Sequence, residues 1–307
     1  MKIAILGAGA MGCIYGAKLC LENEVYLVGR DQQKIDTMAQ NGITLTKDGV
    51  DETFFPNMRI DTSDVGYVDL VIVFVKALAT ITALDSNKHL IGPDTYIMTL
   101  QNGSGHEDEL ANYVDKDKII IGTTEDSGTV LGVGHIRHGG KGVTNIGMLD
   151  GRTDGILAEI KQVFDNCGFD IKIFENIHQL IWNKLMINSS LSVVTGLLQV
   201  KMGLAAQSEH AWAIIEQLCD ETIEVGTAMG LKFDKAECLA KIKDLSVNIP
   251  LGITSICVDL HNGAKTEINT ISGSVVRAGE KYGIDVPTHK LMVMLVKAME
   301  DRTEYLV

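Results

Sequence analysis

Three polar residues in the second half of the chain have types and spacing that suit proton transfer and substrate orientation. Lys184, Asn188 and Ser192 stand four residues apart, so on a helix they share one face. The residues around them are mostly apolar. A lysine in such a helix is either a proton donor or a side chain whose stem packs while its ammonium reaches solvent. The residues alone favour neither interpretation.

A second set of residues suits the binding of a pyrophosphate. Three glycines, at Gly7, Gly9 and Gly12, separate the apolar run 3–6 from an apolar helical pattern. In a strand–turn–helix unit such glycines allow a sharp turn, close approach of the backbone to phosphate, and tight packing of helix on strand. The alternative is a tight turn without a ligand, but the position of the motif favours a dinucleotide. The predicted cofactor contacts in this turn are Gly7, Gly9, Ala10, Met11 and Gly12.

The choice between NAD and NADP depends on residues about 20 positions further on, where a dinucleotide fold meets the adenine ribose. Arg30 and Asp31 are adjacent there. A carboxylate accepts from a 2′-hydroxyl and favours NAD, whereas an arginine pairs with a 2′-phosphate and favours NADP. Asp31 is equally suited to cap a helix over 32–41. We expect NAD, with NADP possible.

Other candidates follow predicted strands, at the edge where parallel sheets bind ligands. Lys76 follows an apolar run over 68–75, Asn102 follows the run 96–100, and Thr123 and Thr124 follow the run 119–122. Lys76 and Asn102 are therefore placed to meet a ligand. The alternative is a solvated residue for Lys76 and a turn for Asn102.

The last candidates lie near the C-terminus. Ser255 and Asp259 are four residues apart on one predicted helical face. Glu267 follows Thr266, the expected cap of a helix over 266–282. The alternative for Asp259 and Glu267 is a solvated or capping carboxylate. The sequence shows no metal-ligand spacing, so we expect no metal.

The elements that must position these residues change type midway along the chain. Strands alternate with helices as far as residue 174, which predicts a doubly wound α/β sheet of the Rossmann type, with antiparallel strands or a hairpin over 128–147. From residue 176 the pattern is helical. We therefore expect a dinucleotide-binding domain over 1–175 and an all-α domain for substrate and dimerisation over 176–307. The expected helices are 176–198, 203–230, 234–246, 254–262, 266–282 and 287–300.

Composition narrows the class of protein. The chain has 307 residues and a net charge of −13, which disfavours a nucleic-acid surface. No apolar run reaches the ~20 residues that span a bilayer. The six cysteines are scattered without a paired spacing, as in reduced proteins. We expect a cytoplasmic homodimer that acts on a small molecule and binds neither membrane nor nucleic acid.

Taken together, these motifs resemble the ketopantoate reductase family of 6-phosphogluconate-dehydrogenase-like oxidoreductases. The resemblance implies that Lys184 is the general acid for carbonyl reduction and that Asn102, Asn188 and Ser255 hold nicotinamide or substrate. It also places Lys76 near the cofactor ribose, Thr124 at the cofactor, Asp259 at the substrate, and Glu267 at the nicotinamide ribose or in support of the site. The motifs are Gly7-x-Gly9-x-x-Gly12, Arg30, Val75-Lys76-Ala77, Gln101-Asn102-Gly103-x-Gly105, Gly122-Thr123-Thr124, Trp182-x-Lys184-Leu185-x-x-Asn188, Ser255-x-x-x-Asp259 and Thr266-Glu267-Ile268.

One departure from the family pattern bears on the substrate. The reductases usually carry a second asparagine followed by proline where this chain has Ser192-Val193. A shorter side chain there discriminates less well for a hydroxylated substrate. The departure resembles the NAD-dependent D-2-hydroxyacid dehydrogenase subgroup, which includes D-mandelate dehydrogenase and reduces 2-oxo acids that are branched or aromatic at C3. The alternatives are an NADPH-dependent 2-dehydropantoate 2-reductase and a non-catalytic NAD(P)-sensing protein.

Overall fold

The computed structural model describes residues 1–139 and 142–301 of the chain. These residues form two compact units. Unit 1 comprises Met1–Gln101 and His106–Ile177, and unit 2 comprises Asn102–Gly105 together with the chain from His178 onward. We describe each unit by itself.

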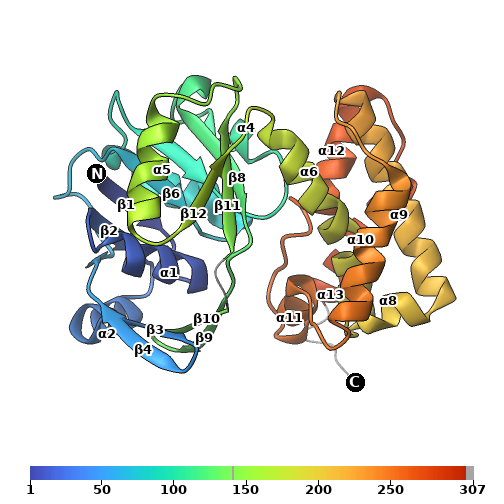
Figure 1. Cartoon of the computed structure of the whole chain (residues 1–307), viewed down its shortest axis with the longest axis horizontal. Helices are drawn as coiled ribbons and strands as arrows, with labels where there is room; N and C mark the ends of the chain where they lie inside the picture. The colour runs from blue at the N-terminus through green and yellow to red at the C-terminus, as the bar shows by residue number, and fades with distance from the viewer. Residues whose placement is uncertain (140–141, 302–307) are drawn as a thin grey trace. The chain divides into compact units, whose positions relative to one another are not determined.

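Unit 1 is built on an eight-stranded sheet with the order β12-β11-β8-β7-β6-β1-β2-β5 (Figure 1). The six strands from β8 to β5 are parallel, whereas β11 runs antiparallel to β8 and parallel to β12. This confirms the Rossmann-type sheet. The strands are β1 (Lys2–Leu6), β2 (Glu24–Val28), β5 (Asn57–Arg59), β6 (Leu70–Val73), β7 (Tyr96–Thr99), β8 (Ile119–Thr124), β11 (Val143–Met148) and β12 (Asp170–Ile173).

Both faces of the central strands are buried, as the continuous apolar runs predict. Along β1, Ile3 and Ile5 point to one face and Ala4 and Leu6 to the other, and all four are at most 1% exposed. Helices and short 3₁₀ turns connect the strands. They are α1 (Ala10–Leu19), α2 (Gln32–Asn41), η1 (Ala77–Ala79), α3 (Thr80–Ser86), η2 (Lys88–Leu90), α4 (His106–Leu110), η3 (Lys116–Lys118) and α5 (Ile156–Asn166).

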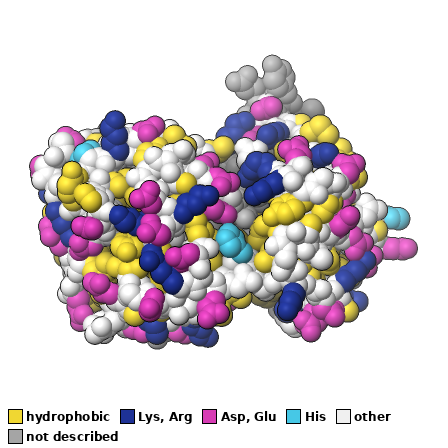
Figure 2. Space-filling model, turned by 90° about the horizontal axis from the view of Figure 1, so that it is seen from above, with side chains coloured by type: hydrophobic (Ala, Val, Ile, Leu, Met, Phe, Trp, Pro, Cys, Tyr) yellow, Lys and Arg dark blue, Asp and Glu magenta, His cyan; other side chains and the backbone are white. Residues whose placement is uncertain are grey.

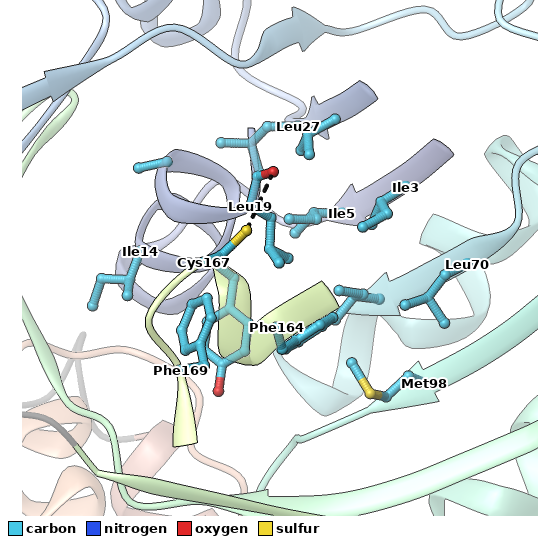
Figure 3. Packing of buried hydrophobic residues seen from close by; sticks show 14 of the residues in the cluster. Ile3, Ile5, Ile14, Leu19, Leu27, Leu70, Met98, Phe164, Cys167 and Phe169 are labelled. Carbon is cyan, nitrogen blue, oxygen red and sulfur yellow. Dashed lines mark hydrogen bonds between the residues drawn. The ribbon is translucent and has the colours of Figure 1, made fainter. Parts of the chain in front are cut away.

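An aromatic cluster joins α1 to the end of the unit. The ring of Tyr15, on α1, stacks on Phe169 with centroids 4.4 Å apart, and Phe164 on α5 closes the group. Figure 3 shows Phe164 and Phe169 beside Ile14, Leu19 and the strand residues of the same face. Burial of these side chains, worth about 1.5–3 kcal/mol each, fixes α1 and α5 on the sheet.

A second, four-stranded sheet of unit 1 has the order β4-β3-β10-β9. Two hairpins far apart in the chain build it, because β3 pairs in parallel with β10. The antiparallel pairing of β9 with β10 confirms the hairpin expected within 128–147. The last strand of that region, β11, pairs with β8 in the main sheet instead. The strands are β3 (Ile43–Lys47), β4 (Val50–Phe54), β9 (Gly128–Gly132) and β10 (His135–His138).

Unit 2 is helical, as expected. Its first rod is α6 (Ile177–Ile187), a five-residue π-helical segment at Asn188–Ser192, here called the π turn, and α7 (Val193–Leu198). The remaining helices are α8 (Gly203–Gln207), α9 (Glu209–Ala228), α10 (Lys235–Asn248), α11 (Ser255–His261), α12 (Ser272–Tyr282) and α13 (Pro287–Asp301).

Two helix boundaries in unit 2 differ from expectation. The helix expected over 203–230 breaks at Ser208, whose hydroxyl caps α9 through the backbone N–H of Ala211. The helix expected to begin at Thr266 begins at Ser272. Thr266 is not its cap: the N–H and hydroxyl of Thr266 donate to the carboxylate of Glu300, and its hydroxyl accepts from the N–H of Ile268, before α12 begins. Among residues 1–139 and 142–301, no helix has the length and apolarity required to cross a bilayer.

Candidate active site

The glycine turn between β1 and α1 is as crowded as the sequence predicts. Gly7 has a φ of +118°, and a Cβ there would lie 2.8 Å from the backbone of Phe74 and Val75. A Cβ on Gly12 would lie 1.8 Å from the carbonyl oxygen of Gly7. No larger residue fits either position without moving the backbone. Gly9 differs, because a Cβ there meets no described atom within 4 Å.

The N-terminus of α1 is suited to an anion. Gly9 occupies the capping position, and within the described residues no side chain caps the helix. Its first turn, which begins with Ala10 and Met11, carries no carboxylate. Backbone N–H groups and the positive end of the helix dipole therefore face the space in front of Gly9. These features fit a dinucleotide pyrophosphate, and the turn residues are the ones that would hold it.

The ribose-discriminating pair after β2 has two different environments. Asp31 caps α2 by accepting from the backbone N–H of Lys34 at 3.2 Å, and its other oxygen is 3.6 Å from the Lys34 ammonium. The capping interpretation of Asp31 is thus confirmed. Arg30 is exposed. Asp31 is exposed as well, so Arg30 is open to a 2′-phosphate and Asp31 to a 2′-hydroxyl.

Two further candidates of unit 1 lie at strand ends. Lys76 is exposed and follows the Phe74–Val75 backbone that abuts Gly7. Gln101, which the sequence reading treated as part of a turn, braces this edge, because its amide donates to the Val75 carbonyl at 2.6 Å. The position of this glutamine, directly after a buried strand, is the sequence feature that could have predicted its bond to the neighbouring strand end. Lys76 thus lies beside the glycine turn, and its predicted contact with the cofactor stays a prediction.

Thr124 lies at the end of β8 but is buried. Its hydroxyl accepts hydrogen bonds from the Tyr15 hydroxyl and from the N–H of Asp126, both at 3.1 Å. These bonds direct the side chain into the interior of unit 1, and its predicted cofactor contact stays a prediction. Beyond it, Asp126 and His138 form a buried pair with Oδ1 and Nε2 2.8 Å apart. Burial raises the pKa of Asp126, but hydrogen bonds from His138 and Gly142 outweigh it and lower that pKa.

In unit 2 the structure brings Lys184, Asn188 and Ser192 into one row. Lys184 is half-buried on α6, where Trp182 and Leu185 are almost fully covered and Asn183 is exposed. Asn188 opens the π turn and Ser192 closes it, and the Ser192 hydroxyl donates to Asn188 Oδ1 at 3.5 Å. Residues four apart on an α-helix drift by about 40°. The wider π turn offsets part of this drift, which keeps Ser192 in line.

Ser255 is linked to this row by the residue before it, Thr254. The hydroxyl of Thr254 donates to the Ser192 carbonyl at 3.4 Å and is 3.2 Å from the Thr195 hydroxyl. Ser255, the next residue, is exposed at the start of α11, and Asp259 lies one turn further on, half-buried. Sequence reasoning missed Thr254 and Thr195. Their hydroxyls gave no spacing signal, because the two helices meet only in the folded chain.

Asn102 and Glu267 also meet within unit 2. The amide of Asn102 donates to the Glu267 carboxylate at 3.2 Å, and the N–H of Ser104 donates to the Thr270 carbonyl at 3.0 Å. At Gly103, a Cβ would lie 2.1 Å from that carbonyl oxygen. The segment Asn102–Gly105 therefore packs in unit 2, although the predicted boundary placed it in the first domain. Main-chain bonds between distant residues caused this difference.

The face in Figure 2 carries Lys and Arg interspersed with Asp and Glu, with no continuous basic stripe over that face. No group of three or more His, Cys, Asp and Glu side chains is arranged to hold a metal ion in the part of the chain that the structure describes.

Comparison with known proteins places both parts of the chain. Residues 3–151 match the family described as "Ketopantoate reductase PanE/ApbA", and residues 176–300 match "Ketopantoate reductase PanE/ApbA C terminal". A 2-dehydropantoate 2-reductase of Streptococcus pyogenes serotype M6 is 29% identical over 302 residues, with 98% of each chain covered.

Two solved structures are similar over nearly the whole chain. A D-mandelate dehydrogenase in ternary complex with NADH and anilino(oxo)acetate has a TM-score of 0.91 and 28% identity, covering 98% of this chain and 99% of that one. A PanE/ApbA family ketopantoate reductase from Ralstonia eutropha JMP134 has a TM-score of 0.90 and 28% identity, covering 99% and 100%.

Proposed function

The chain belongs to the ketopantoate reductase family, and from this premise we propose that it reversibly reduces 2-oxo acids with branched or aromatic C3 groups to D-2-hydroxy acids. At the coarser level it is an oxidoreductase, a nicotinamide-dependent 2-oxo acid reductase that uses NAD(P). The proposal concerns the substrate class and the roles of individual residues.

The observation that carries the substrate class is the end of the Lys184–Asn188–Ser192 row. Ser192 is 6% exposed, and its short hydroxyl donates to Asn188. A serine engaged in this way has little capacity to hydrogen-bond the hydroxyl of a hydroxylated substrate. A substrate with an apolar C3 group therefore binds at no disadvantage relative to a hydroxylated one. The similarity to D-mandelate dehydrogenase, whose complex holds anilino(oxo)acetate, supports the same class.

The proposed chemistry divides between the cofactor and the chain. When bound, the reduced nicotinamide supplies the hydride for C2, so that 2-oxo acid, NAD(P)H and a proton become 2-hydroxy acid and NAD(P)⁺. Lys184 donates that proton to the carbonyl oxygen, and its positive charge stabilises the developing alkoxide. Asn188 and Ser255 orient the carbonyl and carboxylate. Orientation of this kind supplies a large part of the rate, since the reacting carbons must meet at near-contact distance.

The remaining assignments follow the two units. In unit 1 the turn Gly7–Gly12 would hold the pyrophosphate, Arg30 and Asp31 the adenine ribose region, and Lys76 and Thr124 other parts of the cofactor. In unit 2 Asn102, oriented by Glu267 at 3.2 Å, would contact nicotinamide or substrate, and Glu267 the nicotinamide ribose. Asp259, one turn from Ser255, would bound the substrate.

A second candidate function is the NADPH-dependent 2-dehydropantoate 2-reductase reaction. The observation that favours it is the 29% identity to curated relatives with that name over almost their whole length. It uses the same residues and differs in the C3 group and the cofactor. A homodimer and a cytoplasmic location are further proposals; the six cysteines, all unpaired in the structure, suit a reducing compartment.

Initial rates separate these functions. NADH and NADPH oxidation are measured with phenylglyoxylate, 2-oxoisocaproate and ketopantoate, and the product's chirality is determined. Faster turnover of the first two substrates supports the proposal. A preference for ketopantoate with NADPH refutes it in favour of the second candidate, and tight cofactor binding without turnover of any 2-oxo acid indicates a binding protein. In Ser192→Asn, we expect the relative rate with ketopantoate to rise.

A further inference from the structure

The π turn is tied down by hydroxyl groups. A π turn widens the helix, and such segments are rare and concentrate at functional sites. Here Ser190 donates to the Met186 carbonyl at 2.6 Å and Thr195 to the Leu191 carbonyl at 2.7 Å. Both hydroxyls belong to the same helical rod. The third tie, from Thr254 to the Ser192 carbonyl, comes from a different helix.

We propose that Thr254 is a positioning residue, whose hydroxyl fixes the start of α11 to the π turn and so holds Ser255 in register with the Lys184–Asn188–Ser192 row. The inference rests on the proposed function, because it takes Ser255 and Asn188 to be substrate contacts. It adds a residue that touches neither substrate nor cofactor.

The first argument is where the Thr254 hydroxyl goes. Thr254 stands at the N-cap position of α11, where a threonine hydroxyl usually accepts from the helix's own backbone N–H. Within the described residues Thr254 makes no such bond. Its hydroxyl lies 3.4 Å from the Ser192 carbonyl and 3.2 Å from the Thr195 hydroxyl instead. A capping bond would stabilise only α11. The observed bonds of this hydroxyl instead link α11 to the π turn.

The second argument is that the contact is buried and closely packed. Thr254 is 8% exposed and Thr195 is 1% exposed. One residue further along α7, a Cβ on Gly196 would lie 2.4 Å from the Ile256 side chain, so α7 and α11 approach at the limit that glycine permits. Packing sets the distance between the helices, and the paired hydroxyls set their register. Loss of the Thr254 hydroxyl removes the bond to the Ser192 carbonyl that comes from α11 and leaves only the one from Thr195, at 3.5 Å within the same helical rod.

The consequence for catalysis follows from the position of Ser255. A shift of a fraction of an ångström at a substrate-orienting group lowers the rate, and about 1 Å can cost 10²-fold. We therefore expect Thr254→Val to lower kcat/KM for the 2-oxo acid by about tenfold. The KM for the nicotinamide cofactor should not change, because Ser255 and the row that Thr254 holds in register are proposed to contact the substrate.

The test uses the full-length enzyme and four variants. Thr254→Val removes the hydroxyl, and Thr254→Ser restores it. Thr195→Val removes the hydroxyl that Thr254 contacts at 3.2 Å, together with its own bond to the Leu191 carbonyl, and serves if Thr254→Val folds poorly. Ser246→Ala is the matched control, because Ser246 is 1% exposed and donates to a helical carbonyl, that of Ile242, at 3.0 Å on α10. Hydrogen–deuterium exchange of peptides covering 188–192 gives a readout that needs no activity.

We expect a pattern that a purely structural role would not produce. Thr254→Val lowers kcat/KM for the 2-oxo acid and speeds exchange over 188–192, Thr254→Ser recovers both, and Ser246→Ala changes neither. The double variant Thr195→Val/Thr254→Val loses less than the product of the single losses, since the 3.2 Å contact between the two hydroxyls is already lost in each single variant.

Two results overturn the inference. One is a Thr254→Val enzyme with the kcat/KM of Ser246→Ala, and the other is unchanged exchange over 188–192. If the wild-type protein turns over no 2-oxo acid, the proposed function fails, and the exchange result alone then decides whether Thr254 holds the π turn.

Discussion

At the scale of single residues, the candidate site depends on side chains with little room to vary. Lys184 carries the proton transfer in the proposed reaction, and its α6 neighbours Trp182 and Leu185 are each 1% exposed. Arg30 and Asp31 are adjacent in sequence and both exposed, but Asp31 also caps a helix. Each of these residues has a role that one substitution can test.

For Lys184→Ala, we expect kcat to fall by a factor on the order of 10² to 10⁴, because the alkoxide loses both its proton donor and a positive charge. The dissociation constant of the cofactor, measured by fluorescence of the bound dinucleotide, should stay near the wild-type value. Lys241→Ala, which removes an exposed lysine from α10, is the control. A normal kcat in Lys184→Ala contradicts the assignment.

For Arg30→Ala, we expect the KM for NADPH to rise by about tenfold, because the variant loses one exposed charge-assisted contact with the 2′-phosphate. The KM for NADH should change little, since NADH has no phosphate there. Asp31→Asn serves as the comparison because an asparagine still caps α2. Equal changes with both cofactors would show that Arg30 does not read the 2′ position.

At the scale of elements, strands and helices fix these groups by close backbone contacts. The turn before α1 is closed by Gly12, which touches the Gly7 carbonyl, and the turn after β7 places Gly103 against the Thr270 carbonyl. The π turn keeps Asn188 and Ser192 on the face that Lys184 begins. In each case the backbone geometry of the turn or helix, rather than the length of a side chain, sets where the residues of the candidate site lie.

Two glycines of one turn should respond differently to alanine. Gly12→Ala places a Cβ 1.8 Å from a carbonyl oxygen, so we expect a loss of stability of about 1–3 kcal/mol together with weak cofactor binding. Gly9→Ala has room in the protein but fills the space for the pyrophosphate, so it should fold normally and bind the cofactor at least tenfold more weakly.

Urea unfolding and cofactor titration measure the two effects. Gly16→Ala, in the same helix with contacts of 3.4 Å or more, should leave both near wild type. If Gly9→Ala binds the cofactor as tightly as Gly16→Ala, the pyrophosphate does not lie at this turn.

At the scale of the whole molecule, stability depends on pH through a buried histidine of unit 2. His289 is fully buried, with Nε2 2.9 Å from the Thr222 hydroxyl and 3.1 Å from the Leu218 carbonyl. Burial lowers its pKa from 6.5 to about 4, although the nearby Glu221 charge and the Leu218 bond act in the opposite direction. The folded state therefore holds His289 neutral.

The sign of the effect follows from the lowered pKa. As pH falls through 6.5 the unfolded chain takes up a proton that the folded chain refuses until about pH 4, so stability is full above 6.5 and declines between 6.5 and 4. The decline amounts to about 3 kcal/mol. Urea midpoints at pH 7 and pH 4.5 measure it. His289→Asn should flatten the difference and the exposed His210→Asn should not; equal declines in both variants would contradict the assignment.

Local sequence patterns predict much of this molecule. The strand at β1, the glycine turn and the Asp31 cap follow from neighbouring residues, and the structure contains all three. The pairing of β3 with β10 does not, because it joins Thr44 to His135. The π turn left no signal beyond a run of hydroxyl residues. The Thr254 link and the Asn102–Glu267 bond depend on where distant helices meet, which periodicity cannot specify.

The path of Asn102–Gly105 has a consequence for how the protein is made. These four residues leave the ribosome long before Thr270, whose carbonyl accepts the N–H of Ser104. The first segment of unit 2 is thus synthesised early and the rest late. The hydrogen bond between Ser104 and Thr270 can form only after synthesis is nearly finished. A gene cut at residue 177 would give a C-terminal fragment without that first segment. The two units are therefore not two consecutive stretches of the chain, and no single cut separates all residues of one unit from all residues of the other.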